Sequence, residues 1–202
     1  LGQPSSLDHG TFVSSRVIFG DQITEQAAGG QLSPDVKVLS VNLFTRDENG
    51  REKNPTEDEI VTIVRDTVER WHRQIKVYNL SVNIVTKDAA GLFIPVADDN
   101  VGILAAELDY LSRRFGVLFV VSAGNLTAQN RGTAYPNYFG NADCRILPPG
   151  EAMIALTVGS IAGKSLTGSM AASNEPSPFT RRGPGFQEYR KPDLVANGGN
   201  LA

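Results

Sequence analysis

An almost wholly apolar run, 117–121, ends in the small-residue turn Ser122-Ala123-Gly124-Asn125. A run of this kind is typical of a strand that is covered on both faces, as in a parallel sheet. Further strands are predicted at 36–44, 75–82 and 153–159, with helical patterns between them. Strands that alternate with helices predict an α/β fold: a three-layer domain with a mainly parallel central sheet flanked by helices.

The clearest helix is predicted over 57–71. Thr56 and Glu59 have the spacing of a capping box, in which each side chain bonds the other residue's backbone N–H group. Apolar residues recur at helical spacing and predict the buried face: Ile60, Val64, Val68 and Trp71.

A second helix is predicted over 101–115, with Asp99 or Asn100 as the N-cap and Gly116 as the residue that ends it. Its expected apolar face consists of Leu104, Leu108, Leu111 and Phe115. Near the start of the chain, the apolar pattern of 11–18 suits a strand or a helix.

Two groups of residues follow predicted strands, namely Ser81, Val82 and Asn83, and the turn that ends at Asn125. In a parallel sheet, a binding site gathers at the carboxyl ends of the strands. A carboxamide at such an end can stabilise a developing oxyanion, and an imidazole such as His9 can transfer a proton. The pattern therefore points to acyl-transfer chemistry.

The composition narrows the class of protein. With 202 residues, 41% of them hydrophobic, a single domain spanning 1–202 is expected. A net charge of -3 gives no reason to expect nucleic acid or an anionic membrane as a partner, and no apolar stretch is long enough to span a bilayer. The single cysteine, Cys144, excludes an internal disulfide, and two histidines argue against a dedicated zinc site.

Six segments, in order, resemble motifs of the subtilisin-like serine proteases, or subtilases. The segment DHGTFVSS resembles the family's histidine motif, YNLSVN its substrate-pairing segment, and VVSAGN its oxyanion motif. The resemblance continues through EAMIALTVGSI, PFTRRGP and KPDLVANGG, so it covers nearly the whole chain.

The resemblance implies a serine endopeptidase that hydrolyses polypeptides through an acyl-enzyme. His9 would be the general base, Asn125 an oxyanion donor, and Ser81, Val82 and Asn83 the edge that pairs with an extended substrate. Ser122, Ala123 and Gly124 would clear space for that substrate. The resemblance also favours a helix over a strand for 11–18. It allows calcium as a ligand, for which no site is assigned, and no other cofactor is expected.

Two family residues have no counterpart in the sequence. The catalytic Asp of the family lies some tens of residues before the His, and the nucleophilic Ser follows the stretch that KPDLVANGG resembles. We therefore expect the 202 residues to be an inactive central piece of a catalytic domain, taken from a longer protein. Bacterial cytoplasm is favoured over secretion, and the oligomeric state is left open.

Departures from the motifs are few. Phe12 stands where the family has a second His, Asn83 where it has Gly, and Asn197 where it has Pro. The side chain of Asn83 bears on how closely a substrate backbone can approach. Ser169, in TGSMAAS, looks like a scrambled nucleophile motif, but it precedes PFTRRGP instead of following it, so a surface loop is the better interpretation.

Two other functions are alternatives to the protease. One is a peptide-binding or regulatory domain that has kept the fold and lost catalysis. The other is a nucleotide-binding domain, which would require a phosphate loop that the sequence lacks.

Overall fold

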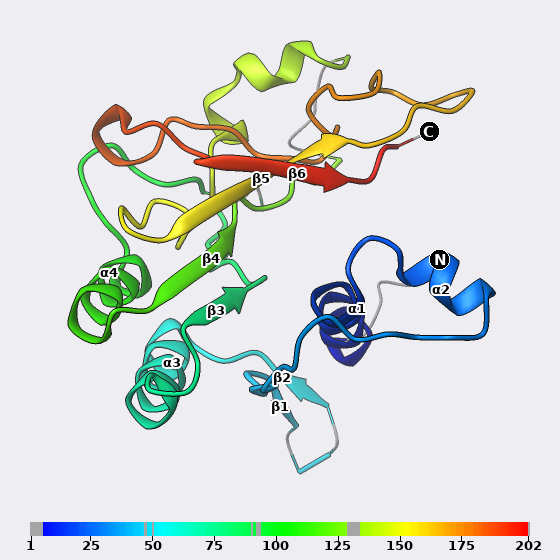
Figure 1. Cartoon of the computed structure of the whole chain (residues 1–202). Coiled ribbons are helices and arrows are strands. Elements are labelled where there is room, and N and C mark those ends of the chain that lie inside the picture. Colours follow the sequence, from blue (N-terminus) through cyan, green and yellow to red (C-terminus); the bar gives the residue numbers. More distant parts are fainter. Residues whose placement is uncertain are drawn as a thin grey trace. The chain divides into compact units, whose positions relative to one another are not determined.

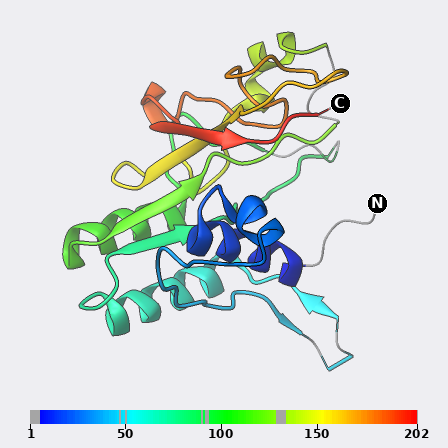
Figure 2. The ribbon, with the colours of Figure 1, turned by 45° about the vertical axis from the view of Figure 1, so that its right-hand side comes forward.

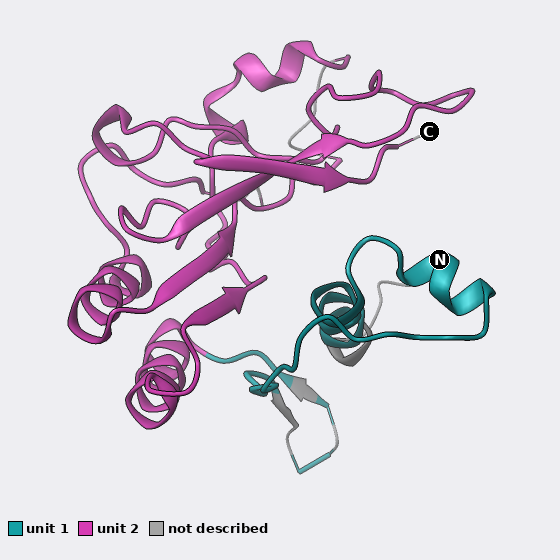
Figure 3. Ribbon diagram, viewed as in Figure 1, with its two compact units in different colours: residues 1–55 teal, residues 56–202 magenta. Residues whose placement is uncertain are grey.

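The computed structural model describes residues 6–46, 48–49, 51–89, 91, 94–128 and 134–201. The chain divides into two compact units, 1–55 and 56–202, which are coloured separately in Figure 3. The single-domain organisation stays a prediction.

Unit 1 contains helices α1 (Ser6–Phe19) and α2 (Ile23–Ala28) and an antiparallel pair of short strands, β1 (Thr45–Arg46) and β2 (Glu52–Lys53). Helix α1 confirms that 11–18 is helical, as the family resemblance implied.

The prediction of a strand at 36–44 is wrong. This segment adopts no regular secondary structure, and several of its apolar side chains are more than two-fifths exposed. An apolar-rich segment describes side chains only, whereas a strand also needs a neighbouring strand to bond its backbone. Within the described residues, 37–44 has no such ladder.

Unit 2 is built on a four-stranded sheet. Its strands are β3 (Val77–Leu80), β4 (Leu118–Ser122), β5 (Leu156–Ala162) and β6 (Leu194–Gly198), in that spatial order. All three pairings are parallel, and the arrowheads lie at the same end of the sheet in Figures 1 and 2. The predicted fold class, α/β with a parallel sheet and flanking helices, is confirmed.

Strands β3 and β4 lie within their predicted ranges, whereas β5 begins and ends three residues later than predicted. Strand β6 was not predicted as a strand. Pro192 precedes it and Gly199 follows it, and its five residues are all exposed, so no buried apolar pattern marks it.

Helices α3 (Glu57–Trp71) and α4 (Ile103–Phe115) pack against each other and against one face of the sheet. Phe119 and Val121 of β4 face this layer and are buried. The predicted apolar faces are confirmed at six positions: Ile60, Val64, Val68, Leu104, Leu108 and Leu111. Trp71 and Phe115, at the ends of the helices, are only half-buried.

Helix α3 begins as predicted. The Thr56 hydroxyl accepts a hydrogen bond from the backbone N–H of Glu59 at 3.3 Å, and the Glu59 carboxylate accepts one from the backbone N–H of Thr56 at 2.8 Å. This capping box satisfies two donors that the first turn of the helix leaves without a partner.

The predicted N-cap of α4 is wrong. Gly102 occupies that position, and two carboxylates from other parts of the chain take the place of a local cap. Glu57 Oε1 accepts from the backbone N–H of Leu104, and Glu151 Oε1 accepts from that of Gly102, both at 3.0 Å. The helix ends as predicted, at Gly116 with φ of 60°.

The described part of 126–150 includes short helical turns and buried side chains. It contains two 3₁₀ turns, η1 (Asn137–Gly140) and η2 (Ala142–Cys144). Tyr138 and Cys144 are buried together with Leu126, and burial raises the pKa of the Cys144 thiol. A third turn, η3 (Phe186–Glu188), precedes β6.

No helix in the described ranges has both the length and the apolar character needed to cross a bilayer.

Candidate active site

The turn after β4 presents one exposed carboxamide. Ala123 and Gly124 are buried, Asn125 is exposed, and Leu126 is again buried. Backbone hydrogen bonds hold the turn on both sides: Ala123 N–H donates to Val158 O at 2.9 Å, and Leu126 N–H donates to Phe179 O at 2.7 Å. The side chain of Asn125 makes no hydrogen bond to any residue that the structure describes.

Gly124 shapes this turn. Its φ is +99°, a conformation that side chains rarely adopt. A Cβ atom at this position would lie 3.0 Å from Arg181 Cδ and 3.1 Å from Leu147 Cδ1, closer than most Cβ contacts in proteins, so these side chains would have to shift. The motif therefore needs glycine for two reasons, the backbone angle and the space.

The predicted substrate edge lies beside this turn. Ser81, Val82 and Asn83 follow the end of β3 and are half-buried. Ser122 Oγ donates to Asn83 Oδ1 at 2.9 Å, and Asn83 Nδ2 donates to Ser122 O at 3.2 Å. Two of the predicted site segments thus meet at the carboxyl edge of the sheet, as parallel strands require.

His9 lies on α1, in unit 1, and its side chain is exposed. The histidine motif is therefore helical, as the resemblance implied. Asn125 belongs to unit 2, so the shared catalytic role of His9 and Asn125, which the family resemblance implies, stays a prediction.

Ser169 lies in a turn between β5 and β6, where its Oγ accepts from the backbone N–H of Leu166 at 3.0 Å. This hydrogen bond gives it a local role in shaping the loop. The placement agrees with the interpretation of Ser169 as a surface-loop residue.

Residues 2–202 match the family model described as Peptidase_S8, the subtilase family. The chain belongs to the subtilase family. Subtilases are in general serine endopeptidases, with a catalytic triad and an oxyanion hole as family features.

This subtilase chain is similar to a curated protein, the uncharacterized protein y4bN of Sinorhizobium fredii. The two are 44% identical over 117 residues, which is 50% of this chain and 27% of the relative. The chain thus aligns with only about a quarter of that relative's length.

Two solved structures are also similar to it. One is a mutant of the protease domain of PatA, with 18% identity and a TM-score of 0.39, covering 65% of this chain and 34% of the other. The second is MycP1 with its N-terminal propeptide removed, with 18% identity and a TM-score of 0.38, covering 72% of this chain and 41% of the other.

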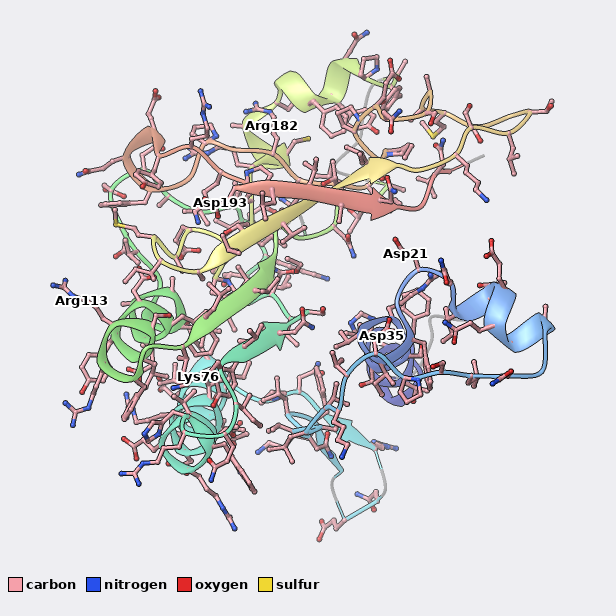
Figure 4. The ribbon with its side chains drawn as sticks, in the orientation of Figure 1. Asp21, Asp35, Lys76, Arg113, Arg182 and Asp193 are labelled. Carbon is pink, nitrogen blue, oxygen red and sulfur yellow. The ribbon has the colours of Figure 1, made fainter. Side chains whose placement is uncertain are left out.

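The KPDLVANGG motif of this subtilase joins two strands. Lys191 Nζ is buried and donates to Ala155 O at 3.0 Å and to Asp193 Oδ2 at 2.7 Å. Asp193 Oδ2 also accepts from the backbone N–H of Thr157 at 2.7 Å. Figure 4 labels Asp193 near the start of β6. The motif thereby fixes β6 beside β5, and its role in this structure is architectural.

Sequence reasoning missed two residues next to the candidate site. Thr180 pairs with Asn125 in an isolated antiparallel bridge, and Arg181 Nε donates to Asn125 O at 2.9 Å. Both belong to the PFTRRGP motif. The Arg181-Arg182 doublet was visible in the sequence, but nothing in its spacing indicated which arginine contacts the turn.

Proposed function

We propose that this chain provides part of the catalytic centre of a serine endopeptidase. His9 acts as general base and acid, and Asn125 donates a hydrogen bond to the oxyanion of the tetrahedral intermediate. The catalytic Asp and the nucleophilic Ser come from polypeptide outside these 202 residues, so the chain alone does not hydrolyse peptides.

The proposal rests on the exposure and the hydrogen bonding of the Asn125 side chain. It is exposed, lies at the carboxyl edge of a parallel sheet, and leaves its N–H donors free of partners within the described chain, while its backbone is held on both sides. A preorganised donor of this kind stabilises charge that develops in a transition state.

The proposed substrate is an extended peptide that pairs with Ser81, Val82 and Asn83. In the described sheet β3 is an edge strand, and this segment continues from its carboxyl end. An extended peptide can add to such an edge through main-chain hydrogen bonds. The Asn83 carboxamide is already bonded to Ser122, so it faces the sheet's own loops.

The test uses the complete protein that contains this chain. A fluorophosphonate should label it, and His9→Ala should abolish both labelling and peptide hydrolysis. Asn125→Ala should lower kcat by about a hundred- to a thousand-fold. Asn100→Ala, an exposed asparagine on a loop of unit 2, serves as the matched control and should leave kcat unchanged.

An unlabelled protein that still binds peptides would refute the endopeptidase. That outcome would instead indicate a regulatory peptide-binding domain with a subtilase fold.

A further inference from the structure

Arg181 places a guanidinium in the interior of unit 2, next to the turn that carries Asn125. Arg181 is 1% exposed. Besides the bond from Nε to Asn125 O, its Nη1 donates to Asp143 O and to Arg145 O, both at 2.8 Å. One side chain therefore joins the turn after β4 to the η2 segment.

Burial lowers the pKa of Arg181 to about 10, so the group remains cationic at neutral pH. Removing a charge from water is costly unless hydrogen bonds compensate. Here the compensation comes from backbone carbonyl oxygens, and bonds from an ionised donor are stronger than neutral ones. Asn125 O is one of these acceptors, so any movement of the turn weakens the solvation of a buried charge.

The stem of Arg181 also restricts the turn. Its Cδ lies where a Cβ of residue 124 would extend, so it fills the space beside Gly124. The neighbouring Thr180 pairs with Asn125 through the backbone, and its Oγ1 accepts from Ser160 N–H at 3.0 Å. The turn is thus bounded by the PFTRRGP segment and by β5.

We propose that Arg181 is a positioning residue for Asn125. It fixes the Asn125 backbone through the carbonyl, and this sets the direction of the Cα–Cβ bond from which the carboxamide extends. The carboxamide makes no hydrogen bond to another described residue, so its position depends on the backbone that carries it. The catalytic consequence rests on the proposed function, whereas the structural consequence does not.

Arg182 offers a matched control. It is a neighbouring, partly buried arginine whose guanidinium also donates to backbone carbonyls, those of Phe139, Gly140, Asn141 and Gly183. None of these acceptors belongs to the turn that carries Asn125. Figure 4 labels Arg182 beside the 3₁₀ turns η1 and η2. Removing its guanidinium should therefore disturb the fold without disturbing that turn.

The first measurement is independent of catalysis. In the 202-residue chain, ¹⁵N relaxation should show that Arg181→Gln lowers the backbone order parameters of Gly124, Asn125 and Leu126 and shifts the Asn125 side-chain amide resonances. Arg182→Gln should leave those signals in place. Unchanged order at Asn125 in a folded Arg181→Gln chain would overturn the proposal.

Arg181→Lys covers the case in which the glutamine variant does not fold. Lysine keeps the charge and much of the aliphatic chain, but it cannot reproduce the planar guanidinium and its fixed set of N–H donors. It should give an intermediate loss of order at Asn125. Complete restoration by lysine would mean that charge alone is sufficient, which contradicts a positioning role.

The second measurement is a double-mutant cycle in the complete, active protein. Arg181→Gln should lower kcat by up to about a hundredfold with little change in KM, because small displacements of catalytic groups are this costly. In an Asn125→Ala background the same substitution should cost almost nothing further. An equal loss in both backgrounds would overturn the proposal. If the wild-type protein hydrolyses no peptide, the proposed function fails, and the relaxation data still decide the role of Arg181.

Discussion

Asn83 and Ser122 join the carboxyl ends of β3 and β4 through a reciprocal pair of hydrogen bonds. The Ser122 hydroxyl donates to the Asn83 carboxamide oxygen, and the Asn83 amide group donates back to the Ser122 carbonyl. The same amide group lies 3.4 Å from Pro148 O. A residue that departs from the subtilase motif, where glycine is usual, thus links the predicted substrate edge to the oxyanion turn.

Asn83→Asp tests this link without changing the shape of the side chain. The carboxylate still accepts from Ser122, but it places negative charge against the carbonyls of Ser122 and Pro148. We expect the free energy of unfolding to fall by about 1–3 kcal/mol, the usual cost of an unsatisfied buried polar group. Urea unfolding measures the change. The control is Asn79→Asp, whose amide bonds only the Ser81 hydroxyl in an exposed setting; a comparable loss there would contradict the interpretation.

Gly124→Ala should destabilise the chain by about 1–3 kcal/mol, since it combines a strained backbone with overpacking. The added methyl group would press on Arg181 and Leu147. Gly140→Ala is the matched control, because nothing lies within 4 Å of the position that its Cβ would take. Thermal unfolding of both variants gives the comparison, and equal melting temperatures would argue against a constrained turn.

Thr56→Ala should cost about 1 kcal/mol, the typical value for losing an N-cap. Thr62 lies on the same helix, is exposed, and bonds only the carbonyl of Asp58 four residues earlier. Thr62→Ala should therefore be close to neutral, because alanine has the higher helix propensity. Chemical denaturation, followed by circular dichroism, separates the two variants. A loss of equal size at both positions would rule out a specific capping effect.

Glu151 should make stability depend on pH. Burial raises the pKa of its carboxyl, and the nearby carboxylates of Glu57 and Asp109 raise it further, while the backbone N–H groups of Gly102 and Glu151 act in the opposite direction. Its Oε2 has no hydrogen-bond partner among the residues that the structure describes. The folded chain therefore keeps a proton that the unfolded chain has already released, so this group's contribution to stability falls as pH rises from about 4.3 through the folded pKa.

Glu151→Gln removes this titration while retaining an oxygen for Gly102. The free energy of unfolding of the variant, relative to wild type, should rise as the pH increases from about 4.3 through the folded pKa of Glu151, and then level off. Denaturant midpoints at several pH values measure it. Glu69→Gln, an exposed substitution on α3, should show no such trend. Parallel pH profiles for wild type and Glu151→Gln would contradict the prediction.

Local signals in the sequence were sufficient for some elements. The capping box at Thr56 and the left-handed Gly116 depend on a few adjacent residues. The start of α3 and the end of α4 were therefore predicted correctly. The apolar faces of α3 and α4 and the buried strand β4 were also predictable, because burial alone gives their patterns. The meeting of Asn83 with Ser122 followed from the direction of parallel strands.

Features that depend on distant partners could not be predicted in this way. Asp99 and Asn100 are good local N-cap residues, yet Glu57 and Glu151 bond the first N–H groups of α4 instead. Strand β6 is recognisable only through its register with β5. The contact between Arg181 and Asn125 spans residues 56 positions apart.

Glu57 couples helices α3 and α4 at their N-termini. This residue is in the first turn of α3, and its carboxylate also bonds the backbone at the beginning of α4. A peptide cut out to represent α4 would therefore lack this carboxylate, and also that of Glu151, at its N-terminus. The two helices are therefore coupled, because unwinding the first turn of α3 would also remove one of the two carboxylates that bond the backbone at the start of α4.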